Sequence, residues 1–240
     1  VDVDSENLNV NFYVKQKKTF EFKNQVKAIG GDLCIANSIQ MKDRDYTIFL
    51  NCDAMGKSIQ GAGGALILGS VFGAIIERTR STKIMQAQSP EKWIKGAFIE
   101  LHKTFETFDG SMLVSMVMGL VDNKTGLLYF INAEHPWTVL YRDEKASFVE
   151  TEFMFHKLGM GGGTHNTIYV RTFQMLAGDV IIVGSDGRDD LIIGKEEISG
   201  QRIINEDENE FLRRVEEGKG DLKQIATAIT NLKKKKKEKN

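Results

Sequence analysis

The sequence has only two cysteines and no excess of either charge. Cys34 and Cys52 are too few for a thiolate zinc site, and we expect them to be reduced core residues, with a disulfide as the alternative. Lys and Arg number 32 against 33 Asp and Glu, so no global field indicates a nucleic-acid or acidic-membrane partner. Reduced cysteines favour a cytoplasmic protein, and no signal peptide opens the chain. The first residue is Val1, and we expect a piece of a longer protein.

Long hydrophobic runs are scarce, and one stretch alone approaches the length of a membrane span. Residues 58–76, SIQGAGGALILGSVFGAII, carry no charge but contain five glycines together with Ser and Gln. This composition favours a buried helix over a span. Small residues recur at every fourth position from Gly61 to Gly73, which allows a neighbouring element to pack closely on one face of the helix. The same spacing is a weak signal for dimerisation.

Most of the remaining chain indicates strands joined by short turns. A second helix is predicted from Ser89, as N-cap, through Phe108, with Pro90 in its first turn. The strands from residue 111 onward are predicted to form a meander. We therefore expect one domain over 1–240, an α+β fold with an antiparallel β-sandwich flanked by helices. The predicted strands are 7–16, 20–29, 33–40, 46–52, 111–121, 127–133, 137–142, 147–153, 167–175 and 180–187, and the closing helices are 208–217 and 221–232.

Two aspartates flank the predicted hairpin between residues 30 and 56. If its turn centres near Asp43 and Arg44, Asp32 lies opposite Met55, and Asp53 is two residues from that position. Cross-strand neighbours lie about 5 to 8 Å apart, so the two carboxylates meet at one end of the hairpin. Like charges this close repel each other, and a divalent metal ion would compensate the repulsion.

A third acid, Asp186, follows the apolar strand VIIVGS and precedes Gly187. Three carboxylates without His or Cys favour hard ions such as Mg²⁺ or Mn²⁺. Two such ions about 4 Å apart suit phosphate ester hydrolysis. The alternative is ordinary turn chemistry, because Asp beside Gly is common at strand ends.

Four blocks resemble the SpoIIE-type branch of the bacterial PPM, or 2C-type, metal-dependent protein phosphatases. They lie in the family's order between Phe20 and Leu191. The blocks are GGD at 30–32, CDAMGKSIQGAGGAL at 52–66, INAEHPWTVLYR at 131–142 and AGDVIIVGSDGRDDL at 177–191.

The resemblance implies α-β-β-α layers and a two-metal centre that hydrolyses phosphoserine or phosphothreonine on a protein, through a hydroxide bridging the metals. Carried over by position, the metal ligands are Asp32, Asp53 and Asp186, together with the carbonyl of Ala54. The cofactors would be two Mn²⁺ or Mg²⁺ ions. The substrate would be a phosphorylated regulator such as an anti-sigma-factor antagonist, and the chain would be the cytosolic output domain of a larger sensor.

Other residues near these blocks have weaker assignments. Lys57 and Arg188 are candidate phosphate contacts, although a helix-start lysine and a turn or capping arginine explain them equally well. His135 is expected to stabilise its loop.

The sequence also departs from the family pattern. Met55 stands where eukaryotic members have a histidine, Glu134 replaces a glycine, and no aspartate follows Asp221, which opens a predicted helix. The family's last strand and its acid are thus not found in this sequence: either the chain is cut or disordered before that strand, or the protein is a degenerate member with a weak or single-metal site. A pseudophosphatase that binds partners without turnover is the alternative function. The lysine run 233–237 is expected to be a solvated helix end, and a nuclease using it is a third, weaker hypothesis.

Overall fold

Three tight turns set the strand layout of the computed structural model. Lys23–Asn24, Lys42–Asp43 and Asp143–Glu144 have positive φ at both central positions. This conformation is typical of type I′ turns, whose twist matches that of the paired strands. The turns join β1 (Lys18–Phe22) to β2 (Gln25–Ile29), β3 (Asp32–Met41) to β4 (Arg44–Ala54), and β7 (Val139–Arg142) to β8 (Lys145–Phe148).

The chain forms two compact units. The first comprises Val1–Val10, Val14–His135 and Glu152–Leu176, and the second comprises Asn11–Tyr13, Pro136–Thr151 and Ala177–Asn240. One domain over residues 1–240 stays a prediction. The structure describes all residues except 1, 2, 4, 17, 57, 58, 154, 162–167, 190, 191, 196–201, 206 and 238–240.

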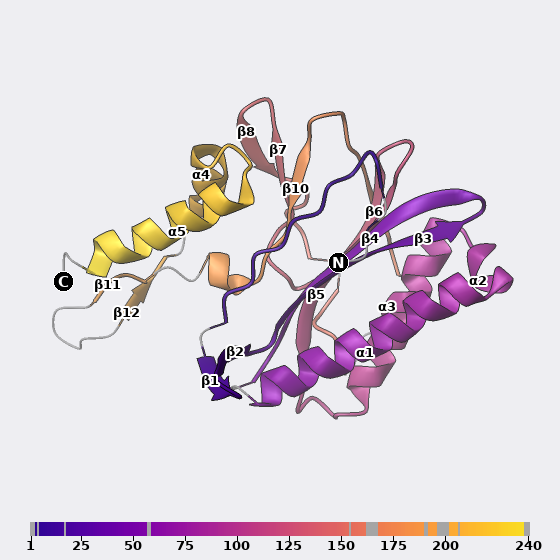
Figure 1. Ribbon diagram of the computed structural model, residues 1–240, viewed down its shortest axis with the longest axis horizontal. Coiled ribbons are helices and arrows are strands. Elements are labelled where there is room, and N and C mark those ends of the chain that lie inside the picture. Colours follow the sequence, from indigo (N-terminus) through magenta and orange to yellow (C-terminus); the bar gives the residue numbers. More distant parts are fainter. Residues whose placement is uncertain are drawn as a thin grey trace. The chain divides into compact units, whose positions relative to one another are not determined.

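The first unit is built on a five-stranded antiparallel sheet in the order β3-β4-β5-β6-β9 (Figure 1). Its later strands are β5 (Val114–Asp122), β6 (Leu127–Ala133) and β9 (Arg171–Gln174). Helix α1 (Ile59–Ser81) packs on β3 and β4, and α3 (Pro90–Glu106) packs on β5 and β6, with the short α2 (Lys83–Gln86) between the two helices. The main apolar core lies between these helices and the sheet, where Leu50, Phe72 and Trp93 are fully buried.

Helix α1 is the one helix in the described part of the chain that is long and apolar enough to cross a membrane. Its buried side, which includes Gly61 and Leu68, packs on the sheet, whereas Ile59 and Leu66 are exposed. The expected close neighbour is present at Gly61 but not at Gly73, where an added Cβ would meet no described atom within 4 Å. The predicted small-residue face is therefore only partly a packing face.

Helix α3 begins as predicted. The Ser89 hydroxyl accepts a hydrogen bond from the Lys92 amide, and Pro90 occupies the first turn. The N-cap thus satisfies one of the amides that have no partner within the helix. The face expected to be apolar is buried, namely Trp93, Ala97, Leu101 and Phe105.

The second unit joins a three-stranded antiparallel sheet, β10-β7-β8, to the C-terminal helices. Its remaining elements are β10 (Val180–Ile182), the 3-10 turn η1 (Asp186–Arg188), the hairpin strands β11 (Ile192–Lys195) and β12 (Arg202–Ile204), α4 (Glu210–Glu217) and α5 (Leu222–Lys237). Val139, Ile182, Phe211 and Val215 form its small core.

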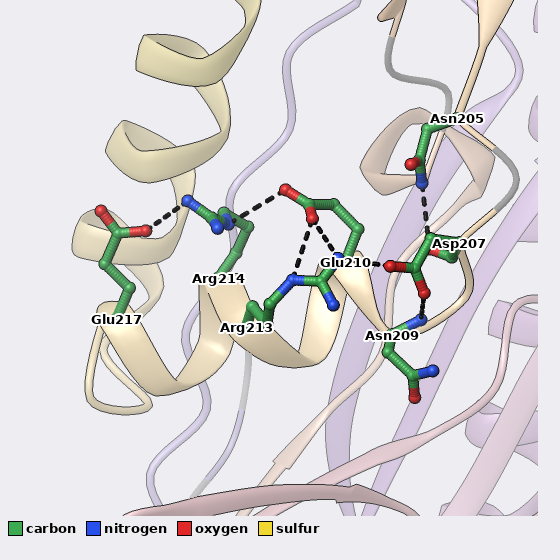
Figure 2. A network of polar contacts seen from close by, with 7 residues as sticks. All are labelled: Asn205, Asp207, Asn209, Glu210, Arg213, Arg214 and Glu217. Atoms are coloured by element: carbon green, nitrogen blue, oxygen red, sulfur yellow. Dashed lines mark hydrogen bonds and ion pairs between the residues drawn. The ribbon is translucent and has the colours of Figure 1, made fainter.

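The start of α4 is held by charged side chains (Figure 2). Arg213 pairs with both Asp207 and Glu210, and Asp207 also accepts a hydrogen bond from the Asn209 amide. These bonds to its carboxylate lower the pKa of Asp207. The network replaces a conventional cap, because the Asn209 side chain makes no capping bond.

The fold class is confirmed as α+β with antiparallel sheets and helices, but five strand predictions are wrong in whole or in part. Residues 20–29 form the β1–β2 hairpin instead of one strand, because Lys23 and Asn24 turn the chain. The described residues of 7–16 pair with no strand. The meander ends at β6, which pairs with β9, while β7 and β8 pair with β10. The predicted strand 147–153 is paired only to Phe148. The predicted strand 180–187 ends at Ile182, and η1 begins at Asp186.

Candidate metal centre

Asp32 and Asp53 lie directly opposite each other at the end of the β3–β4 pair. The prediction placed Asp32 opposite Met55. That register was wrong by two residues, because the turn uses Lys42 and Asp43. The Ala54 amide donates to the Gly31 carbonyl at 3.0 Å, which makes Asp32 and Asp53 a non-hydrogen-bonded pair. In such pairs the Cα atoms are only about 4.5 Å apart and the side chains approach closely. The carboxylates are thus closer neighbours than the sequence suggested.

The surroundings of this pair leave an uncompensated oxygen. Asp32 Oδ1 is buried and has no hydrogen-bond partner among the residues that the structure describes. A buried acceptor of this kind is costly and indicates a missing partner atom. The backbone below it is fixed, since Gln16 Nε2 donates to the Asp32 carbonyl at 3.0 Å.

Two glycines let the backbone pack closely against the carbonyl of Ala54. A Cβ at Gly31 would lie 2.2 Å from the Ala54 oxygen and 3.0 Å from Asp53 Oδ1. A Cβ at Gly61, in the first turn of α1, would lie 3.0 Å from the same Ala54 oxygen. Only glycine at these positions lets the two backbone segments approach the carbonyl this closely.

The oxygens gathered here are suitable donors for a hard divalent ion. Two carboxylates and a backbone carbonyl, with no thiolate or imidazole among the opposed residues, match the donor set of Mg²⁺ or Mn²⁺. The buried Asp32 oxygen, which has no hydrogen-bond partner among the described residues, fits such an ion. Among the described residues, no group of three or more His, Cys, Asp or Glu side chains is placed to hold a metal by itself.

The third predicted ligand, Asp186, belongs to the second unit. It opens η1, where the Asp189 amide donates to its carbonyl at 2.8 Å. The convergence of Asp186 with the other two acids stays a prediction. Lys57, the first candidate phosphate contact, lies outside the described residues.

Arg188 is almost fully buried in the second unit. Its guanidinium carbon lies 4.4 Å from the centroid of the Phe211 ring on α4, and its Nε donates to Asp189. Burial lowers the pKa of Arg188. These contacts favour the turn role that the sequence had left open, while the phosphate role stays a prediction.

A buried polar network lies on the sheet face that carries Asp53. Ser115, which pairs with Asp53 across β4 and β5, has its Oγ 3.1 Å from His135 Nδ1. His135 Nε2 lies 2.6 Å from Asn51 Oδ1, and Asn51 Nδ2 donates to Cys34 Sγ. Asn51 stands two residues before Asp53 on β4, so both point to the same face.

The backbone and the ring of His135 have different partners. Its backbone amide donates to Asn132 Oδ1 at 2.8 Å, a loop bond that does not involve the ring, so the expected loop role of the histidine stays a prediction. The two ring bonds were missed, because they reach strands 20 and 84 residues away. Glu134, in the family's glycine position, adopts a positive φ of 46°, the left-handed conformation for which glycine is preferred.

The two cysteines are free and cannot pair without a change of register. Cys34 lies opposite Asn51, so Cys52, one residue further along β4, points to the other face of the sheet. Burial raises the pKa of both thiols. The reduced state is the expectation that the structure supports.

Comparison with known families adds independent evidence. The family described as stage II sporulation protein E (SpoIIE) matches residues 43–239, which is most of the chain. The chain belongs to the SpoIIE family. The matched range contains Asp53, His135 and Asp186, whereas Asp32 and strand β3 lie before it or at its edge.

Solved structures confirm that this SpoIIE-family chain has the PP2C phosphatase fold. One is of the RsbU and RsbW domains of a Mycobacterium tuberculosis protein, 19% identical, with TM-score 0.59, covering 86% of this chain and 52% of that chain. Another is the PP2C phosphatase domain of Bacillus subtilis SpoIIE with a fragment of its regulatory domain, 12% identical, with TM-score 0.59, covering 86% and 55%. A third is an S. agalactiae serine/threonine phosphatase, 11% identical, with TM-score 0.57, covering 85% and 90%.

The SpoIIE-family chain spans about half the length of the first two of these proteins. A search of curated sequences finds no significant match. At identities this low the likeness shows the fold, and the chemistry has to be argued from the site.

Proposed function

We propose that this SpoIIE-family domain is a divalent-metal-dependent phosphatase that hydrolyses phosphoserine or phosphothreonine on a protein. The observation that carries the proposal is the direct opposition of Asp32 and Asp53, with one buried oxygen that lacks a partner among the described residues. Two like charges at opposed positions repel each other. A cation that binds both carboxylates supplies a physical reason for the arrangement.

The chain's own oxygens would do the binding. Asp32, Asp53, the Ala54 carbonyl and Asp186 would hold two Mn²⁺ or Mg²⁺ ions. When bound, such ions lower the pKa of a water molecule and neutralise charge on the transferred phosphoryl group. Strands β3 and β4 orient the first two carboxylates, and the backbone of Gly31 packs closely against the Ala54 carbonyl.

The proposed substrate is a small phosphorylated regulator, such as an anti-sigma-factor antagonist, in the cytosol of a bacterium. Support comes from the solved neighbours, whose names place an RsbU domain beside an RsbW domain and a phosphatase domain beside a regulatory one. By the same analogy, this chain would be the output domain of a longer signalling protein.

A pseudophosphatase is the second candidate. The last aspartate, Asp221, is used as a helix cap, since its carboxylate accepts from the Gln224 amide at 2.9 Å and its carbonyl from the Ile225 amide. It is therefore unsuited to complete a metal site. Met55, half exposed, offers no proton to a leaving group. A domain with a weakened centre would still present the fold to a protein partner.

Release of phosphate from a generic aryl phosphate, measured with and without Mn²⁺, tests the proposal. We expect Mn²⁺-dependent turnover that Asp53→Asn reduces by at least about 100-fold, because a ligand oxygen and its charge are lost. Asp45→Asn is the matched control: it lies on the same strand, is exposed, and should leave turnover unchanged.

Two outcomes decide between the candidates. Turnover that persists in Asp53→Asn at the wild-type rate refutes the assigned site. No turnover in any variant, together with measurable Mn²⁺ binding by the wild type, supports the pseudophosphatase.

A further inference from the structure

Four side chains beneath Asp53 form one directional chain of hydrogen bonds. Asn51 Nδ2 donates to Cys34 Sγ at 3.0 Å, so the other amide atom, Oδ1, faces His135 Nε2 as an acceptor at 2.6 Å. His135 Nε2 therefore carries the proton, and Nδ1 is left as an acceptor. The Ser115 hydroxyl has two acceptors within reach: His135 Nδ1 at 3.1 Å and the Asp53 carbonyl at the longer distance of 3.5 Å. We assign its single proton to the nearer acceptor, the ring nitrogen.

This series of hydrogen bonds connects three strands and one loop. It runs from Ser115 on β5 through His135, after β6, to Asn51 on β4 and Cys34 on β3. His135 is fully buried, and Asn51 and Ser115 are each only 8% exposed. In such surroundings a polar group left without its partner costs about 1–3 kcal/mol, so each link constrains the next.

Two members of the network, Ser115 and Asn51, lie next to the proposed metal ligand Asp53. Ser115 is the cross-strand partner of Asp53, and Asn51 is its neighbour on the same face of β4. The two ring nitrogens of His135 contact both residues, Nδ1 contacting Ser115 and Nε2 contacting Asn51. Among the described side-chain hydrogen bonds, those of His135 are the ones that link Ser115 to Asn51.

We propose that His135 is a positioning residue that fixes the β4–β5 backbone and thereby the Asp53 carboxylate. The inference rests on the proposed metal-binding function of Asp53. Supporting groups of this kind contribute about 10- to 100-fold to metal affinity when they orient a ligand.

His135→Phe, compared with His102→Phe, tests the proposal. His102 is also a buried histidine of the first unit, but it lies on α3, where its Nε2 is 3.3 Å from Glu106 Oε1. Helix α3 covers the sheet face opposite to Asp53, so this control removes a buried ring without touching the network. Ser115→Ala removes one link with less loss of volume, and His135→Gln restores one donor and one acceptor.

The first measurement is Mn²⁺ affinity, by calorimetric titration of the full chain. We expect His135→Phe to weaken binding by at least about 10-fold, Ser115→Ala to weaken it less, His135→Gln to recover part of the loss, and His102→Phe to leave it unchanged. Equal affinities in His135→Phe and His102→Phe would overturn the proposal.

The second measurement needs no metal. Amide hydrogen exchange over residues 51–54 and 114–117 should be faster in His135→Phe and Ser115→Ala than in the wild type or His102→Phe, because local opening becomes easier. Unchanged exchange there refutes the positioning role. A wild type that binds no Mn²⁺ sinks the proposed function instead, and the exchange result then still decides whether His135 holds this backbone.

Discussion

Asp32→Asn should stabilise the metal-free protein, which is the opposite of what most substitutions at a partly buried position do. The wild type holds two carboxylates opposite each other, and Asp32 Oδ1 has no hydrogen-bond partner in the described part of the chain. The amide removes one charge from this pair. It also supplies two N–H donors, which a carboxylate lacks.

The expected gain follows from the separation of the pair. Two unit charges about 5 Å apart repel by roughly 0.8 kcal/mol in bulk water and by about 3 kcal/mol at the effective dielectric constant typical near a protein surface. A gain between about 1 and 3 kcal/mol raises Tm by roughly 2 °C or more in a chain of this size.

Mn²⁺ should reverse the order of stability. At a concentration 100 times its dissociation constant, a ligand that binds only the folded state stabilises the wild type by about 2.7 kcal/mol. Asp32→Asn lacks a ligand oxygen with full charge and should gain much less. The wild type should then melt at or above the temperature of the variant.

Thermal unfolding with EDTA and with excess Mn²⁺ provides the test, with Asp45→Asn as control. Asp45 is exposed on β4, the strand paired with β3, and its change should stay within about 0.5 kcal/mol in both conditions. If Asp32→Asn melts below the wild type in EDTA, the repulsion argument is wrong. If Mn²⁺ shifts both proteins equally, Asp32 is no ligand.

Three further predictions concern packing and thiol chemistry. Gly31→Ala should cost about 1–3 kcal/mol in urea unfolding and weaken Mn²⁺ binding, because its Cβ would press on the Ala54 carbonyl. Phe211→Leu should cost about 1–2 kcal/mol more in the wild type than in an Arg188→Met background, since only the former loses the cation–π contact. Cys34 and Cys52 should resist a thiol reagent at pH 7.5, since their raised pKa values keep them protonated, and both should react after unfolding.

Each of these has a contrary result. If Gly31→Ala is as stable as the wild type, the backbone at residue 31 does not pack tightly against the Ala54 carbonyl. If the losses of unfolding free energy in the Arg188 and Phe211 variants are additive, the two side chains do not stabilise each other, and η1 and α4 are not coupled through them. Rapid labelling of either cysteine in the native protein, or a disulfide between them under mild oxidation, would contradict the strand register.

Local patterns in the sequence were enough for helices α1, α3, α4 and α5 and for most strands, whereas α2 and the β11–β12 hairpin were not predicted. The α3 start was predictable because Ser89 and Pro90 act within one turn of the chain. The turn at Lys42 and Asp43 was placed one residue too late, since neither residue has the strong preference for positive φ that would have located it. That error shifted Asp32 by two positions along β4.

Long-range pairing was the part that local patterns could not supply. Strands β6 and β7 follow each other closely in the chain, and nothing in either one says that β6 pairs with β9 and β7 with β10. The choice depends on which strands find complementary edges and buried faces, which is a property of the whole sheet.

The sequence alone determined the chemistry that is available: aspartates beside glycines at strand ends, no thiolate or imidazole cluster, and apolar periods that specify an α+β fold. Tertiary structure alone decided that Asp32 faces Asp53 directly, that the Ala54 carbonyl lies between two glycines, and that His135 bonds Ser115 and Asn51. The reason is physical: residue type fixes charge and donor capacity, whereas proximity between distant residues depends on strand register, which is set when the sheet forms.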